Sequence, residues 1–112
     1  MKSAVTVKEN YLFRRMYRKG RSVVTPCFVV YCLPNKNGFS RLGITTGTKL
    51  GHAVVRNRAR RRLRELYRLN KADMVPGYDV ILVARSRCVT GDFARMTEQY
   101  RDALAKLELL KP

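Results

Sequence analysis

Hydrophobic side chains recur at helical spacing between His52 and Leu69. Drawn at about 100° per residue, the stretch gathers its apolar side chains on one side and its polar side chains around the rest of the circumference. The apolar stripe consists of Val55, Ala59, Leu63 and Leu66. Neither glycine nor proline interrupts the core of the stretch, residues 56–68. The pattern predicts an amphipathic helix over residues 52–69 that buries this stripe.

Two further segments are predicted to be helices. Thr6-Val7-Lys8-Glu9 has the form of a capping box, which predicts a short helix over residues 7–18 that stops at Gly20. After a turn at residues 90–92, side chains recur at helical spacing almost to the C-terminus. They are Phe93, Thr97, Tyr100, Leu104 and Leu107. The third helix therefore begins near Phe93.

Three apolar stretches have the character of strands. Residues 28–33 are rich in β-branched and aromatic side chains, and a strong turn signal follows them. Residues 39–46 are predicted to form a second strand, so the two segments predict a hairpin. Residues 78–84 are almost continuously apolar, as expected for an interior strand. Residues 21–25 form a possible short extra strand. The order of elements predicts a single α/β domain (two-layer α+β) spanning residues 1–112.

Charge changes this picture, because 24 Lys and Arg residues face 8 Asp and Glu residues and give a net charge of +16. Residues 56–68 hold seven arginines and one acid, Glu65, which has Arg61 and Arg68 near it at helical spacing. A merely solvated helix face mixes both signs, whereas this uniform charge disfavours the helix by self-repulsion. Guanidinium groups donate bidentately to phosphate and stack on bases. The predicted helix, called the arginine helix below, therefore indicates a nucleic-acid partner.

The sequence offers little for catalysis. Its eight acidic residues form no Asp-x-Asp or Glu-x-x-His pattern. Its one histidine, His52, has no evident partner with which to act as a catalytic base. We expect His52 to help begin the arginine helix or to contact phosphate. The three cysteines, Cys27, Cys32 and Cys88, lack Cys-x-x-Cys spacing and are interpreted as buried small hydrophobes. We therefore expect no catalytic site, no metal site and no cofactor bound by the chain itself.

Aromatic residues suggest a second binding element. Phe13 and Tyr17 lie one turn apart on the first predicted helix, and Tyr31 lies on the first strand of the predicted hairpin. Exposed aromatic rings beside a basic surface can stack on single-stranded RNA. Aromatic rings at helical spacing are also common in cores, and periodicity alone does not separate stacking from packing.

Several segments resemble the signature of the bacterial ribonuclease P protein component. They are Gly43-Ile44-Thr45-Thr46, Lys49-Leu50-Gly51 and the run from Ala53 to Glu65. That family carries an Arg-Asn-Arg motif followed by basic residues on one long helix. The resemblance extends to Phe13, Gly20 and the strands at residues 28–31 and 79–85, and so covers nearly the whole chain.

The resemblance implies a four-stranded sheet with three helices, in the order helix, three strands, helix, strand, helix. It also implies a left-handed βαβ crossover around the arginine helix, as in the second domain of a ribosomal protein, against the usual hand. The implied activity belongs to a ribonucleoprotein endonuclease. In it the protein binds the catalytic RNA and the 5′ leader of precursor tRNA and promotes 5′-end maturation at low Mg²⁺, while the RNA subunit holds the Mg²⁺.

The resemblance also implies binding residues. Those facing the RNA subunit are Arg56, Asn57, Arg58, Arg60, Arg61 and Arg64, together with Lys49 and Arg68. Those lining the cleft for the leader are Phe13, Tyr17 and Tyr31. The chain departs from the family where Gly47-Thr48-Lys49 replaces the usual Ser-Lys-Lys and His52 replaces asparagine. These departures bear on fine contacts to leader or metal.

Other functions fit parts of the sequence. A structural RNA-binding protein of ribosomal type, with no role in cleavage, would share the charge but need no selectivity for a leader. A membrane-surface helix is disfavoured because the apolar stripe lacks Trp and Phe. DNA binding lacks support from helix-turn-helix spacing. No apolar run approaches the roughly 20 residues of a membrane span, and the first residues lack the apolar stretch of a signal peptide. We therefore expect a cytoplasmic protein. We also expect no membrane partner and no small-molecule substrate.

Overall fold

The computed structural model describes residues 5–6 and 10–112, with side chains from Phe13 onward. In chain order its elements are β1 (Val5–Thr6), α1 (Asn10–Lys19), β2 (Arg21–Val24), β3 (Phe28–Pro34), β4 (Arg41–Thr45), the 3-10 turn η1 (Thr48–Leu50), α2 (Ala53–Asn70), η2 (Lys71–Asp73), β5 (Tyr78–Ala84), α3 (Arg87–Thr90) and α4 (Phe93–Lys106). The strands form one sheet in the order β1-β4-β5-β3-β2. Apart from the two-residue edge strand β1, this is the four-stranded mixed sheet that we expected.

The centre of the sheet is β5, as its continuous apolar run predicts. It pairs in parallel with β4, where Leu42 lies opposite Val80, and antiparallel with β3, where Val30 lies opposite Leu82. Because β5 lies between two strands and under helices, its middle residues are buried. The unit β4-α2-β5 is thus a crossover between neighbouring parallel strands, and its left-handed turn stays a prediction.

The predicted hairpin of residues 28–33 and 39–46 is wrong. β3 and β4 are separated by β5, and the true hairpin joins β2 to β3, with Val23 opposite Val30. Its turn is closed by Thr25, whose backbone N–H and hydroxyl donate to the carbonyl of Phe28 at 2.8 and 2.6 Å. A turn signal marks where the chain reverses, but the apolar character of β5 decides which strands become neighbours.

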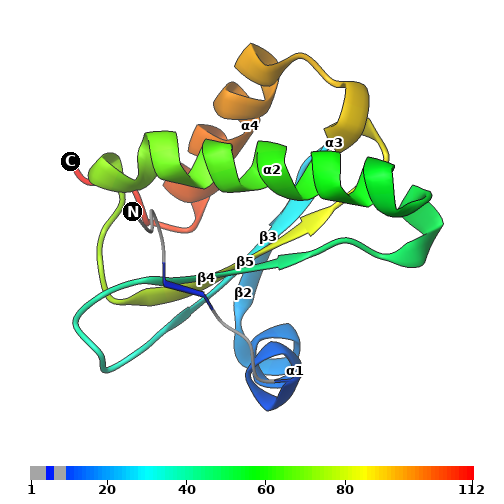
Figure 1. Cartoon of the computed structure of the whole chain (residues 1–112). Helices are drawn as coiled ribbons and strands as arrows, with labels where there is room; N and C mark the ends of the chain where they lie inside the picture. The colour runs from blue at the N-terminus through cyan, green and yellow to red at the C-terminus, as the bar shows by residue number, and fades with distance from the viewer. Residues whose placement is uncertain (1–4, 7–9) are drawn as a thin grey trace.

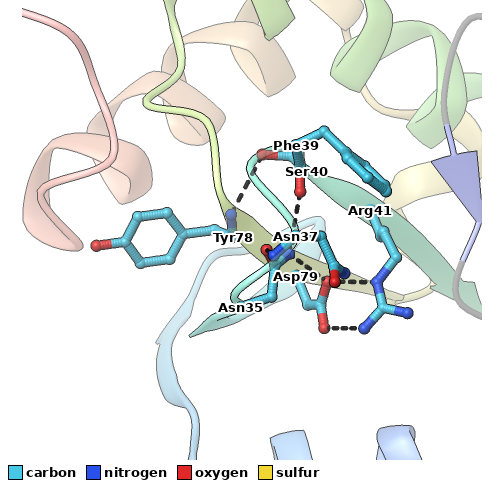
Figure 2. Close-up of polar contacts among 7 residues, drawn as sticks. All are labelled: Asn35, Asn37, Phe39, Ser40, Arg41, Tyr78 and Asp79. Carbon is cyan, nitrogen blue, oxygen red and sulfur yellow. Dashed lines mark hydrogen bonds and ion pairs between the residues drawn. The ribbon is translucent and has the colours of Figure 1, made fainter.

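A polar network around the buried Asp79 fixes the connection from β3 to β4 against the start of β5 (Figure 2). Asp79 accepts hydrogen bonds from Nε and an Nη of Arg41 at 2.8 and 2.7 Å and from the amide of Asn35 at 2.8 Å. Asn35 also donates its backbone N–H to the carbonyl of Gly77 at 2.8 Å. Because the Asp79 side chain is only 5% exposed, this charge-assisted pair holds the connection in one conformation.

Helices cover both faces of the sheet, with α2, α3 and α4 on one face and α1 on the other (Figure 1). The core lies between the sheet and α2 and α4, which confirms the two-layer α+β class. Its fully buried large side chains include Phe28, Leu63, Leu66, Leu82, Met96, Tyr100 and Leu104. All three cysteines are free and buried, as we interpreted them.

The helix boundaries differ from the predictions mainly at the N-terminus. Thr6 does not cap a helix, because it lies in β1 opposite Leu42, and α1 begins only at Asn10. Glu9, the other half of the predicted capping box, lies outside the described residues. The arginine helix is α2, with His52 at its N-cap, and it extends one residue beyond the predicted end. The single-turn helix α3 was not predicted.

Candidate nucleic-acid interface

The outer face of α2 is a stripe of exposed polar and basic side chains. As the period of the sequence predicts, Ala59, Leu63 and Leu66 are fully buried against the core. The outer face carries Asn57, Arg58, Arg61, Arg64 and Arg68, all exposed. The stripe therefore offers guanidinium groups to solvent, while the opposite side of the helix is buried. Figure 1 shows α2 lying across one face of the sheet.

Two arginines on one flank of α2 are tied to the end of β4. Nε of Arg56 donates to the backbone carbonyl of Thr46 at 3.1 Å, and an Nη of Arg60 donates to the hydroxyl of the same threonine at 2.9 Å. The other Nη of Arg60 donates to the side-chain carbonyl of Asn57 at 3.1 Å. Both arginines are half-buried. The predicted binding residues Arg56, Asn57 and Arg60 thus form one hydrogen-bonded group.

On the opposite flank, Arg62 belongs to the fold rather than to the outer stripe. One Nη donates to the carbonyl of Gly91 and lies 3.3 Å from the sulfur of Met96, and the guanidinium carbon lies 5.8 Å from the ring centre of Phe93. These contacts join α2 to α4 across the short connection that follows α3. The sequence pattern groups Arg62 with the basic circumference of the helix, whereas in the structure its side chain is half-buried against α4.

Arg68 is the one outer arginine with an ion pair among the described contacts. Its Nε and an Nη donate to the two carboxylate oxygens of Glu65 at 2.9 and 2.6 Å. This bonding lowers the pKa of Glu65 below its usual value. Of the two arginines expected near Glu65, Arg68 is the one that pairs with it, so Arg68 offers a partner less uncompensated charge than Arg61 or Arg64 does.

The three aromatic residues predicted to bind a single strand come together on the face of the sheet that α1 covers. The ring centres of Tyr17 and Tyr31 are 4.9 Å apart in an edge-on arrangement, and those of Phe13 and Tyr17 are 6.4 Å apart. Tyr17 is 43% exposed, while Phe13 and Tyr31 are half-buried. We call these three residues the aromatic cluster. Part of each ring contributes to packing, and Tyr17 presents the most surface to solvent.

Sequence reasoning missed Gly43 of β4, which gives the aromatic cluster its floor. A Cβ atom at this position would lie 3.0 Å from Cζ of Phe13 and 3.4 Å from Cγ1 of Ile81. Gly43 therefore lets the Phe13 ring lie directly on the sheet. A lone glycine inside a strand pattern is a signal of such a close approach, and it could have identified this position.

The segment in which the chain departs from the family pattern connects β4 to α2. Lys49 is exposed on η1, and His52 is exposed at the N-cap of α2 and makes no side-chain capping hydrogen bond. Gly47 and Thr48 are also exposed. Lys49 thus adds a positive charge next to the start of the arginine helix.

The end of β4 separates the two candidate surfaces. Successive residues of a strand point to opposite faces of the sheet. Accordingly, the hydroxyl of Thr45 meets that of Tyr17 at 3.1 Å on the aromatic side, while Thr46 meets Arg56 and Arg60 on the other side. The arginine helix and the aromatic cluster are thus two surfaces joined through two adjacent threonines.

Within the described part of the chain, no three His, Cys, Asp or Glu side chains gather as a metal site would require. Among the same residues, no helix is long and apolar enough to cross a membrane. The chemistry that the described surfaces offer is hydrogen bonding and charge from guanidinium groups, and stacking from aromatic rings.

Comparisons with known proteins agree on one family. The family model described as Ribonuclease P matches residues 1–108. The ribonuclease P protein component of Natranaerobius thermophilus is 41% identical over 111 residues, which cover 99% of this chain and 96% of that relative. The solved RNase P protein of Staphylococcus aureus has a TM-score of 0.82 at 33% identity, over 96% of this chain and 99% of that one. The RNase P protein of Thermotoga maritima has a TM-score of 0.77 at 29% identity, over 87% and 92%.

Proposed function

This chain belongs to the ribonuclease P protein family, and from that premise we propose that it binds a catalytic RNA and the 5′ leader of precursor tRNA. In this role it promotes endonucleolytic 5′-end maturation of tRNA at low Mg²⁺. The RNA subunit carries out catalysis and holds the Mg²⁺, and the protein contributes charge and position. The particle works in the cytoplasm, where precursor tRNA is made.

The observation that carries the proposal is the outer stripe of α2. Arg58, Arg61 and Arg64 are exposed on one helix, and the chain as a whole has a net charge of +16. Each such guanidinium that meets a phosphate releases counterions, so binding gains free energy and becomes salt-dependent. A protein placed between two RNAs in this way also reduces the repulsion between their phosphates, which lowers the Mg²⁺ concentration that assembly needs.

The aromatic cluster supports the second part of the proposal. A leader is single-stranded, and unpaired bases stack on aromatic rings without regard to sequence. The partly exposed ring of Tyr17, flanked by Phe13 and Tyr31, gives such a strand a surface next to exposed Arg14 and Arg18 of α1. These two arginines supply charge for the phosphates of the same strand.

The experiment that tests the proposal is cleavage of a leader-bearing precursor tRNA by the cognate RNA subunit at low Mg²⁺, with and without this chain. We expect cleavage only when both are present, and none from the chain alone. Activity from the chain alone would show that it carries a catalytic site of its own. Absence of any stimulation would favour a structural RNA-binding protein of ribosomal type.

A variant pair makes the experiment specific to the interface. Replacing both Arg61 and Arg64 by Ala removes two exposed charges from the outer stripe, whereas Arg95→Ala removes an exposed charge from α4. We expect the double variant to need more Mg²⁺ for the same cleavage rate. The Arg95 variant should behave as the unchanged protein does.

A further inference from the structure

Thr46 lies between the end of β4 and the arginine helix, and it is only 5% exposed. We propose that Thr46 is a positioning residue for RNA binding, which holds the side chains of Arg56 and Arg60 in the orientation that meets phosphate. This inference rests on the proposed function, because it concerns how the arginine helix presents its charge to RNA.

The geometry shows how one residue serves two arginines. The backbone carbonyl of Thr46 accepts from Nε of Arg56 at 3.1 Å, and its hydroxyl accepts from an Nη of Arg60 at 2.9 Å. Arg60 then reaches Asn57 through its other Nη at 3.1 Å. Because Arg56 and Arg60 are one turn apart on α2, Thr46 holds them as a pair.

The contacts leave most of the donors of Arg60 available. A guanidinium has five N–H groups, and the hydrogen bonds among the described residues use two of those on Arg60. The bond to Asn57 also fixes the amide of that residue, since the carbonyl that faces Arg60 directs the NH₂ group away from it. The side chains thus present donors in a fixed arrangement before any ligand arrives.

Such fixing favours binding because long side chains lose rotamer freedom when they bind. An arginine that the fold already holds loses less of that freedom, so the affinity of the complex rises without any new contact to the ligand. Arg61 is exposed on the outer stripe and its side chain has no hydrogen bond to any other residue that the structure describes, so it lacks this advantage. We therefore infer that Arg56 and Arg60 set the register of the RNA, while the outer arginines add attraction.

The neighbouring residue provides a matched control. Thr45 is half-buried, and its hydroxyl lies on the other face of the sheet, 3.1 Å from that of Tyr17. Thr45→Val and Thr46→Val are the same chemical change at adjacent positions. Only the second removes a hydrogen bond to the arginine helix.

The test is a double-mutant cycle on affinity for the RNA subunit, measured over a range of salt concentrations. We expect Thr46→Val to weaken binding by about three- to tenfold, the range of one typical hydrogen bond, and to leave the salt dependence unchanged because no charge is lost. Arg60→Ala should weaken binding and reduce the salt dependence by roughly one phosphate contact. Combined with Arg60→Ala, the Thr46 change should add nothing further.

Thr46→Ser keeps the hydroxyl and loses the methyl group, so it should bind RNA as the unchanged protein does. Rescue by serine also separates positioning from packing if the valine variant folds poorly. Equal effects of Thr46→Val and Thr45→Val, or additive effects of Thr46→Val and Arg60→Ala, would overturn the inference. If Arg61→Ala and Arg64→Ala weaken binding and the Thr46 and Arg60 variants do not, only the positioning inference fails. If none of these variants changes RNA binding, the proposed function fails as well.

Discussion

The hydroxyl of Tyr17 lies 3.1 Å from the hydroxyl of Thr45, which stands 28 residues further along the chain. This contact joins α1 to the end of β4 and places the Tyr17 ring edge-on to Tyr31, 4.9 Å away between ring centres. The aromatic cluster is therefore held by a polar contact as well as by packing. A surface fixed in this way can receive a flexible strand with little reorganisation of its own.

Loss of an aromatic ring should weaken binding of the leader selectively. We expect Phe13→Ala or Tyr31→Ala to reduce the affinity for leader-bearing precursor tRNA by about 1–3 kcal/mol for each lost stack, with little change for mature tRNA. Phe39→Ala is the matched control, because Phe39 is an exposed ring, 48% exposed, in the connection from β3 to β4. Equal losses for precursor and mature tRNA would count against the cluster as a leader site.

Neighbouring arginines on α2 should respond in opposite ways. Arg61→Ala should leave the free energy of unfolding within about 0.5 kcal/mol and reduce the salt dependence of RNA binding by roughly one phosphate contact. Arg62→Ala should lower the free energy of unfolding by about 1–3 kcal/mol, because Arg62 bonds the Gly91 carbonyl and packs on Phe93. Urea unfolding and salt titration of RNA binding measure the two effects. A stable Arg62 variant with a reduced salt dependence would contradict the assignment.

The ion pair of half-buried Arg41 with buried Asp79 should matter far more to stability than an exposed pair. Arg41→Ala removes two of the hydrogen bonds to a carboxylate that is 5% exposed, and we expect a loss of about 3–5 kcal/mol in the free energy of unfolding. Glu108, which faces Arg21 at 3.8 Å, is 85% exposed. Its replacement by Gln should change stability by less than about 0.5 kcal/mol. Similar losses for both variants in urea unfolding would contradict this difference.

Alkaline pH should destabilise the fold through Cys88. Burial raises the pKa of its thiol from the ordinary value of 9.0 to about 11, against the lowering effect of nearby Arg62 and with a smaller contribution from Cys27. Between these two pH values the thiol of the unfolded chain is deprotonated while that of the folded chain is still protonated. The stabilisation that comes from the protonated thiol is therefore complete below about pH 9 and is lost as the pH rises toward about 11. Buried Tyr100 also has a raised pKa, so the unchanged protein is compared with Cys88→Ala. The variant should show the shallower loss of stability across this interval, and parallel curves would refute the prediction.

The long periodic elements of the fold could be predicted from sequence, and the strand neighbours could not. The stripe of Ala59, Leu63 and Leu66 fixes both the existence and the buried side of α2, and the apolar run of β5 predicts its interior place. The prediction of the hairpin failed because a turn signal is local, whereas the choice of neighbouring strands depends on which strand buries the most apolar surface. Thr6 illustrates the same limit, because its capping-box pattern is local, whereas in the structure Thr6 pairs with Leu42 of β4.

The candidate interface divides along a similar line. Charge identifies the basic residues of α2 without distinguishing among them, and the resemblance leaves out Arg62 without indicating what that residue does. Only the structure shows that Arg60 is tied to Thr46, that Arg62 serves the core and that Arg68 is paired with Glu65. Gly43 and Thr46 belong to the family signature, but their roles depend on contacts with α1 and α2 that charge and period do not identify.

The central place of β5 also governs when the molecule can form during synthesis. β3 and β4 pair with β5 and not with one another, so neither can complete its place in the sheet until Tyr78–Ala84 has left the ribosome. All the arginines of α2 are translated before that point, and their helix has no finished sheet to pack on. A nascent chain therefore exposes the positive charge of α2 before the sheet that holds this helix in place is complete.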